Sequence, residues 1–98
     1  MGPLDPSLHP FVAGERVIAI PRRAALRLAL LDWVAQDFEP GVRYSEKMVN
    51  LVLGRRFSDT ALLRRLLVDE GLMSREAGEY WRSGGSVQDP SAQEAPAG

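Results

Sequence analysis

The chain has no cysteine and a single histidine among its 98 residues. Without thiols it has neither a disulfide framework nor thiolate metal ligands, and nothing in it requires an oxidising compartment. His9 alone cannot form a histidine-based nucleophile relay or a paired-histidine metal site within one chain. We therefore expect no catalytic residue, no metal site and no cofactor, and we expect that the protein is not an enzyme.

Long apolar runs are also absent from the sequence. No stretch approaches the roughly 18 apolar residues of a membrane-spanning helix. The N-terminus lacks the charged start and apolar centre of a signal peptide. We expect a cytoplasmic protein with no membrane contact. Its hydrophobic content of 45% is enough for one modest core.

An overall excess of positive charge is lacking too, because the formal net charge is −1. The charges are unevenly placed, however. Residues 15–82 hold all 12 basic residues and 10 of the 13 acidic residues, which gives this span a net charge of +2. Such a balance permits a basic surface that binds nucleic acid but does not demand one.

Composition divides the chain into three parts. Residues 1–13 hold three prolines and little periodicity, and residues 84–98 are rich in glycine, alanine, proline and serine. We expect both ends to be flexible and loosely packed, with a disordered C-terminal tail. One domain is expected over residues 14–83. It begins with a β-branched run at residues 16–20, which is either an edge strand or an extended arm that stops at Pro21.

A first helix is predicted over residues 22–38, where apolar residues lie on two sides. The expected core stripe consists of Ala24, Leu28, Leu31, Val34, Ala35 and Phe38. The opposite side carries Leu26, Ala29, Leu30 and Trp33. Either the N-terminal arm or an aromatic strand covers this second side, or Leu26, Leu30 and Trp33 form a dimer interface.

Two more helices follow, joined by a short basic turn. Ser45 caps the second helix, which is expected to end near Gly54 or Arg56 with Met48, Leu51 and Val52 facing inward and Val49 as a further candidate. The third helix begins at Ser58 as its N-cap and ends at Gly71, which suits the left-handed conformation that terminates helices. Its apolar face carries Leu62, Leu63, Leu66 and Leu67. Two helices with so short a connection are typical of a helix-turn-helix.

A hairpin completes the predicted fold. Leu72-Met73 and Tyr80-Trp81 read as its arms, and residues 74–79 as its tip. Arg43-Tyr44 could add a third strand. We therefore predict an α+β fold, mainly α with a small β-hairpin, namely a winged helix-turn-helix with three helices and a wing sheet of two or three strands.

The core also resembles a known family of small bacterial domains, domain of unknown function 2087, over roughly residues 16–82. The features that carry the likeness are Ile20-Pro21-Arg22-Arg23, the run from Phe38 to Glu46, Val49-Asn50, the run from Leu63 to Leu72, and Tyr80-Trp81. The resemblance implies a winged-helix-like domain associated with transcriptional regulators, since such domains occur alone or joined to helix-turn-helix proteins.

Basic residues on the third helix and its surroundings indicate a DNA-binding face. The expected contacts to double-stranded DNA are Arg55, Arg56, Thr60, Arg64, Arg65 and Arg75. Acidic residues on the same helix and hairpin could instead pair with these arginines. We predict a transcription-associated DNA-binding domain that forms a homodimer or joins a partner regulator protein. The alternative is a protein-interaction or dimerisation module without DNA contact, which presents Leu26, Leu30 and Trp33.

Overall fold

The computed structural model describes residues 4–86. Within that range the protein is α+β, with four helices and two small antiparallel sheets. The helices are η1 (Pro6–Phe11, a 3-10 helix), α1 (Ala24–Ala35), α2 (Glu46–Gly54) and α3 (Thr60–Asp69). The strands are β1 (Val12–Ala13), β2 (Arg16–Val17), β3 (Arg43–Ser45), β4 (Met73–Glu76) and β5 (Glu79–Arg82). Among these residues, no helix is both long enough and apolar enough to cross a membrane.

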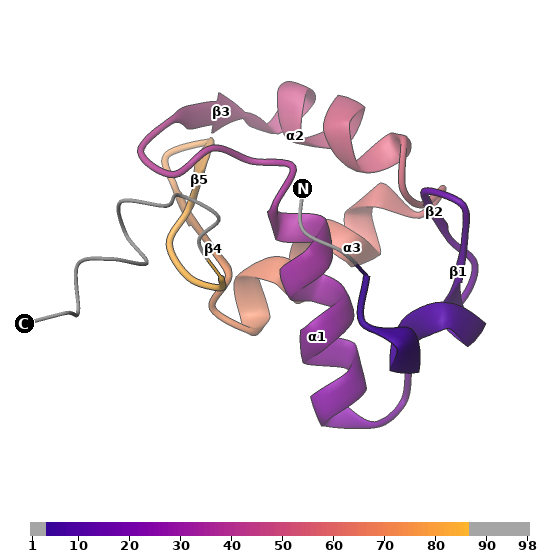
Figure 1. Cartoon of the computed structure of the whole chain (residues 1–98). Helices are drawn as coiled ribbons and strands as arrows, with labels where there is room; N and C mark the ends of the chain where they lie inside the picture. The colour runs from indigo at the N-terminus through magenta and orange to yellow at the C-terminus, as the bar shows by residue number, and fades with distance from the viewer. Residues whose placement is uncertain (1–3, 87–98) are drawn as a thin grey trace, which may run out of the picture.

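The two sheets lie at opposite ends of the helices, as Figure 1 shows. The larger one has the strand order β3-β5-β4, so the strand that precedes α2 pairs with the last strand of the chain. Tyr44 lies opposite Tyr80 in this pairing. The expected third strand is therefore confirmed. Because β3 runs directly into α2, its pairing with β5 holds the start of α2 against the hairpin.

The hairpin turn is tighter than the six-residue tip expected from the sequence. Strands β4 and β5 pair up to Glu76 and Glu79, which leaves only Ala77 and Gly78 in the turn. Both residues have positive φ, 53° and 81°. Two left-handed residues in succession form the turn whose twist matches that of a two-stranded ribbon. Ser74 and Arg75 consequently belong to β4 rather than to a loop.

Helix α1 is the centre of the core and is buried on more than one side. Leu30, Leu31, Val34 and Ala35 are fully buried, and Phe38 packs just beyond the helix end. Leu28, which was expected inside, is 43% exposed. The helix is also shorter than the predicted range of 22–38, because residues 36–38 continue as turns and Pro21 precedes its start by three residues.

The N-terminal segment packs on the domain, contrary to the expectation for residues 1–13. Asp5 caps η1 by accepting a hydrogen bond from the Ser7 amide, and this bond lowers the pKa of the Asp5 carboxyl. Leu8 is buried in the core and η1 contacts α1. The β1–β2 hairpin follows, and Val17 donates its amide to the Arg56 carbonyl at 2.7 Å. Residues 1–3 lie outside the described range.

The first residues of the expected C-terminal tail are also attached to the domain. Ser86 donates its amide and its hydroxyl to the carboxylate of Asp32 on α1, at 2.6 and 2.7 Å. The Ser86 carbonyl accepts a hydrogen bond from Gln36 at 2.8 Å. The prediction of disorder for the remaining residues, 87–98, falls outside the described part of the chain.

Candidate nucleic-acid interface

Helix α3 presents one apolar and one polar side. Its N-cap is Asp59, not the expected Ser58, because the Asp59 carboxylate accepts a hydrogen bond from the Leu62 amide at 3.0 Å. Leu63 and Leu67 are buried one turn apart. At about 100° per residue, Arg65 lies opposite their midpoint, and it is exposed.

A groove of about 520 Å³ lies beside the outer side of α3, between that helix and the hairpin. Its lining consists of Asp59, Ala61, Leu62, Arg64, Arg65, Val68, Asp69, Arg75 and Tyr80. Three of the six arginine and threonine positions predicted to bind DNA therefore meet here: Arg64 and Arg65 from α3, and Arg75 from β4. Their three guanidinium groups face two carboxylates, those of Asp59 and Asp69.

Two of these arginines are available for a ligand. Within residues 4–86, the exposed side chains of Arg65 and Arg75 make no hydrogen bond and no ion pair. The nearby carboxylates of the hairpin and α3 have other partners: Glu79 pairs with Arg43 at 3.6 Å and Glu70 pairs with Arg27 at 3.7 Å. Arg65 and Arg75 thus form no ion pair in the described part of the chain, although the carboxylates of Asp59 and Asp69 line the same groove.

Arg64 is held in place by helix α2. Its Nη1 donates a hydrogen bond to the side-chain oxygen of Asn50, and its Nε lies 3.9 Å from a carboxylate oxygen of Glu46. The same Glu46 oxygen accepts a hydrogen bond from the buried Tyr80 hydroxyl at 3.0 Å. This chain of contacts joins α2, α3 and β5 and sets the direction of the Arg64 side chain.

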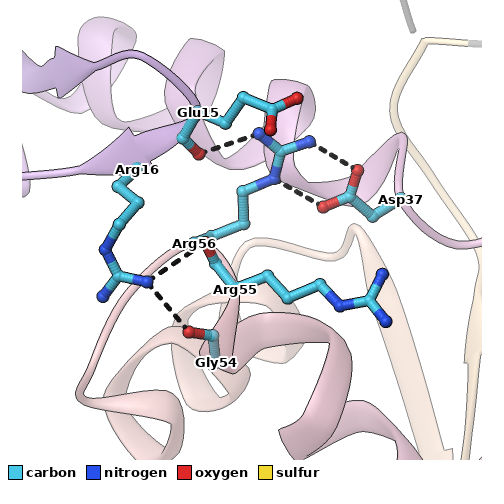
Figure 2. A network of polar contacts seen from close by, with 6 residues as sticks. All are labelled: Glu15, Arg16, Asp37, Gly54, Arg55 and Arg56. Atoms are coloured by element: carbon cyan, nitrogen blue, oxygen red, sulfur yellow. Dashed lines mark hydrogen bonds and ion pairs between the residues drawn. The ribbon is translucent and has the colours of Figure 1, made fainter.

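Arg56 was predicted to contact DNA, but it is an internal residue. Figure 2 shows its guanidinium between the Glu15 carbonyl and the Asp37 carboxylate. It makes two hydrogen bonds to Asp37, at 2.7 and 2.8 Å, and one to Glu15 at 2.9 Å. It also stacks over the Trp33 ring, 4.4 Å from the centroid. The hydrogen bonds to Asp37 raise the pKa of Arg56. With 7% of its surface exposed, Arg56 is not accessible to DNA.

Arg55 and Thr60 also lie away from the groove. Arg55 is exposed and lines a separate hollow of about 240 Å³ together with Glu15 and Asp37. Figure 2 shows its side chain leaving the turn in a different direction from that of Arg56. Thr60 is half-buried next to Gly54 at the end of α2. The groove thus includes Arg64, Arg65 and Arg75 and leaves out the other three predicted contacts.

The dimer interface predicted on α1 is wrong for one of its three residues. Leu30 is fully buried, and Leu26 and Trp33 are half-buried. The N-terminal segment does pack on this helix, since η1 contacts α1. Part of the cover on Trp33 is the Arg56 guanidinium, which comes from the distant α2–α3 turn. The apolar face that is exposed instead carries Met48 and Leu51 of α2, which the sequence analysis had placed inside.

Metal ligands are not grouped in this part of the chain. Among residues 4–86, no three histidine, cysteine, aspartate or glutamate side chains come together in a way that could hold a metal ion. The charged groups that line the groove beside α3 are the guanidinium groups of Arg64, Arg65 and Arg75 and the carboxylates of Asp59 and Asp69.

The geometry defines an α+β domain with a groove between α3 and the hairpin that is lined by three arginines and two aspartates. Residues 16–82 match the model of a family described as "Uncharacterized protein conserved in bacteria (DUF2087)". Since the match covers well over half of the chain, the protein belongs to this family, and the resemblance seen in the sequence is confirmed. No curated protein and no solved structure matches the chain.

Proposed function

We propose that the chain is a winged helix-turn-helix domain that binds double-stranded DNA and acts in transcription. The element order after α1, namely β3, α2, α3, β4 and β5, supports the fold assignment. So does the strand order β3-β5-β4, which sets the hairpin beside α3. In helix-turn-helix proteins the second helix of the pair enters the major groove, and α3 takes that position here.

The observation that carries the proposal is the arginine-lined groove between α3 and the hairpin. Exposed guanidinium groups without carboxylate partners favour phosphate as a ligand, because a phosphate accepts two parallel hydrogen bonds from one guanidinium. Arg65 and Arg75 come from different elements and line the same groove. A DNA strand that follows the groove would meet both.

Each arginine of the groove has a distinct role in this proposal. Arg65 lies on the most outward line of α3 and reaches base edges or phosphates of the major groove. Arg75 on β4 contacts an adjacent phosphate. Arg64 adds positive charge to the groove, and its side chain keeps one orientation because Asn50 and Glu46 hold it.

The test is fluorescence anisotropy of a labelled duplex, titrated at low salt with the protein and its variants. We expect Arg65→Ala and Arg75→Ala each to weaken binding about fivefold, which corresponds to roughly 1 kcal/mol for a charged contact that is open to solvent. Circular dichroism should show unchanged folding, since both side chains are exposed and make no contact that the fold needs.

Arg55→Ala is the matched control for these variants. It removes the same charge from an exposed, unpartnered side chain that lines the other hollow. Its affinity for the duplex should equal that of the unmodified protein. An equal loss in all three variants would mean that net charge alone drives the binding, and unchanged affinity in all three would remove the groove from the DNA hypothesis.

A role in transcription would locate the protein in the cytoplasm of a bacterial cell, where DNA is accessible. Dimerisation stays a prediction without an assigned surface, because the interface predicted on α1 has Leu30 in the core. If a symmetric dimer forms, its two copies would read half-sites about one helical turn apart.

A further inference from the structure

Helix α2 has an exposed side that is apolar at its centre and basic at both ends. We call Lys47, Met48, Leu51 and Arg55 the α2 outer face. Leu51 is 60% exposed and Met48 is 47% exposed. At 100° per residue, Leu51 lies opposite the midpoint of the buried Val49 and Leu53. The core therefore takes up one side of α2 and leaves the outer face to solvent.

The fold does not need apolar side chains at Met48 and Leu51. Val49 and Leu53 already provide the buried side of this nine-residue helix. The described residues have five large hydrophobic side chains that are exposed, and two of them lie one turn apart on this one face. Single exposed apolar residues are common on protein surfaces, but adjacent ones indicate an interaction surface.

The two charged residues of the α2 outer face, Lys47 and Arg55, are both basic, although Arg55 also lines the hollow that contains the carboxylates of Glu15 and Asp37. Lys47 and Arg55 are four residues before and after Leu51, and both lie next to it on the helix surface. Within residues 4–86 neither side chain makes a hydrogen bond or an ion pair. The one carboxylate of α2, that of Glu46, is engaged with the Tyr80 hydroxyl and with Arg64 on the other side of the helix.

We propose that the α2 outer face binds an acidic amphipathic helix of another protein. Apolar side chains of the partner would pack on Leu51 and Met48, and its carboxylates would pair with Lys47 and Arg55. A helix of this kind would contact the apolar side chains and the basic side chains of the face at the same time. The nine residues of α2 extend over about 13 Å, enough for two to three turns of a partner helix.

Charge complementarity decides against the other occupants. A second copy would place the same face against itself about a two-fold axis, which brings Lys47 and Arg55 of both copies together. DNA would offer phosphates to the two cations but would leave Leu51 and Met48 without an extended apolar surface. None of the four residues lines the groove beside α3, so variants of the two surfaces can be made separately.

The experiment uses a fluorescein-labelled helical peptide of about 15 residues, the length at which isolated helices begin to be stable. Leucines occupy one side of the peptide and glutamates the other. Anisotropy measures its affinity for the full chain, and a second peptide with lysines in place of the glutamates tests the sign of the charge. Amide chemical shifts in ¹⁵N-labelled protein locate the contact.

The proposal predicts that the acidic peptide binds, that the lysine peptide does not, and that the shifted amides belong to α2. Leu51→Ala should weaken binding roughly tenfold, as expected for a central apolar contact. Leu28→Ala, which removes a similarly exposed leucine from α1, should have no effect. Arg55→Ala should weaken peptide binding severalfold and Arg65→Ala should not, the reverse of their expected effects on DNA. Alanine favours the helix, so the α2 variants should fold.

Four outcomes would overturn the proposal. One is the absence of peptide binding at about 1 mM, which corresponds to only about 4 kcal/mol of binding free energy. Another is equal binding of the acidic and lysine peptides. The third is a set of shifted amides on α3 and the hairpin, which would place the peptide at a different site. The fourth is self-association of the chain that Leu51→Ala abolishes, which would make a second copy the occupant of the face.

Discussion

At the scale of single residues, Arg56 shows how a side chain that looks like a DNA contact becomes part of the core. It connects the N-terminal hairpin, the end of α1 and the α2–α3 turn through Glu15, Trp33 and Asp37. Nothing in the sequence separates it from its neighbour Arg55. Its partners lie 19 and 41 residues away, and only the fold brings them together.

Replacing Arg56 should therefore affect stability more than binding. We expect Arg56→Ala to lower the free energy of unfolding by about 3 kcal/mol, because it leaves the Asp37 carboxylate partly buried without its partner. Arg56→Lys should cost less, since it keeps the charge and loses the two parallel hydrogen bonds. Urea denaturation measures both. Arg55→Ala should stay within about 0.5 kcal/mol of the unmodified protein, and an equally small effect of Arg56→Ala would contradict the assigned role.

A second prediction at this scale concerns Ala77 in the hairpin turn. Its φ of 53° lies in the left-handed region, where the side-chain methyl is unfavourable and glycine is not. We expect Ala77→Gly to raise the free energy of unfolding by about 1 kcal/mol. Ala61→Gly, an exposed position inside α3, should lower it by a similar amount. Thermal denaturation of both variants checks the turn assignment, and destabilisation by Ala77→Gly would contradict it.

At the scale of elements, the sequence predicted the position of a helix well where both of its ends are marked. Helix α3 has polar N-cap candidates and Gly71 after its end, and its observed start differs by one residue in the choice of cap. In α2 five of nine residues are apolar, so two different stripes satisfy the same helical period. The pairing of β3 with β5 selects the stripe with Val49 and Leu53, and that pairing is a long-range contact which periodicity does not contain.

Helix α1 also shows that helical periodicity does not identify long-range contacts. Because apolar residues surround it, the sequence indicated that something covers its second side but did not identify the cover. Of the candidate DNA site, the sequence predicted the three groove arginines correctly as neighbours. It missed the two residues of α2 that hold Arg64, Asn50 and Glu46, because two polar residues on a neighbouring helix have no signature in the sequence.

The N-terminal 3-10 helix provides a test of this cover. Leu8 has 1% of its surface exposed, so Leu8→Ala should lower the free energy of unfolding by 2 to 4 kcal/mol, roughly the cost of a large cavity in a core. Ile18, the residue after β2, is 59% exposed, so Ile18→Ala should change the free energy of unfolding by about 0.5 kcal/mol or less. Equal effects of the two variants in urea denaturation would mean that the segment does not pack on α1 in solution.

At the scale of the whole molecule, the structure separates two surfaces by chemistry. The groove between α3 and the hairpin has arginines from two elements, and we propose that it binds a phosphate backbone. The α2 outer face has basic and apolar side chains, and we propose that it binds an acidic helix. The core, with Arg56 among its contacts, keeps α2 and α3 in a fixed relation, so that both surfaces depend on the same packing.

The salt dependence of duplex binding tests the DNA proposal most directly, because phosphate contacts release counterions. With Arg64, Arg65 and Arg75 each neutralising one phosphate, a plot of log K against log salt concentration should have a slope of about −2.7 for one copy. Arg65→Ala should reduce the magnitude of the slope by about 0.9, whereas Arg55→Ala should leave it unchanged. A slope near zero, or no binding at a protein concentration of about 10⁻⁴ M, would contradict DNA binding by this groove.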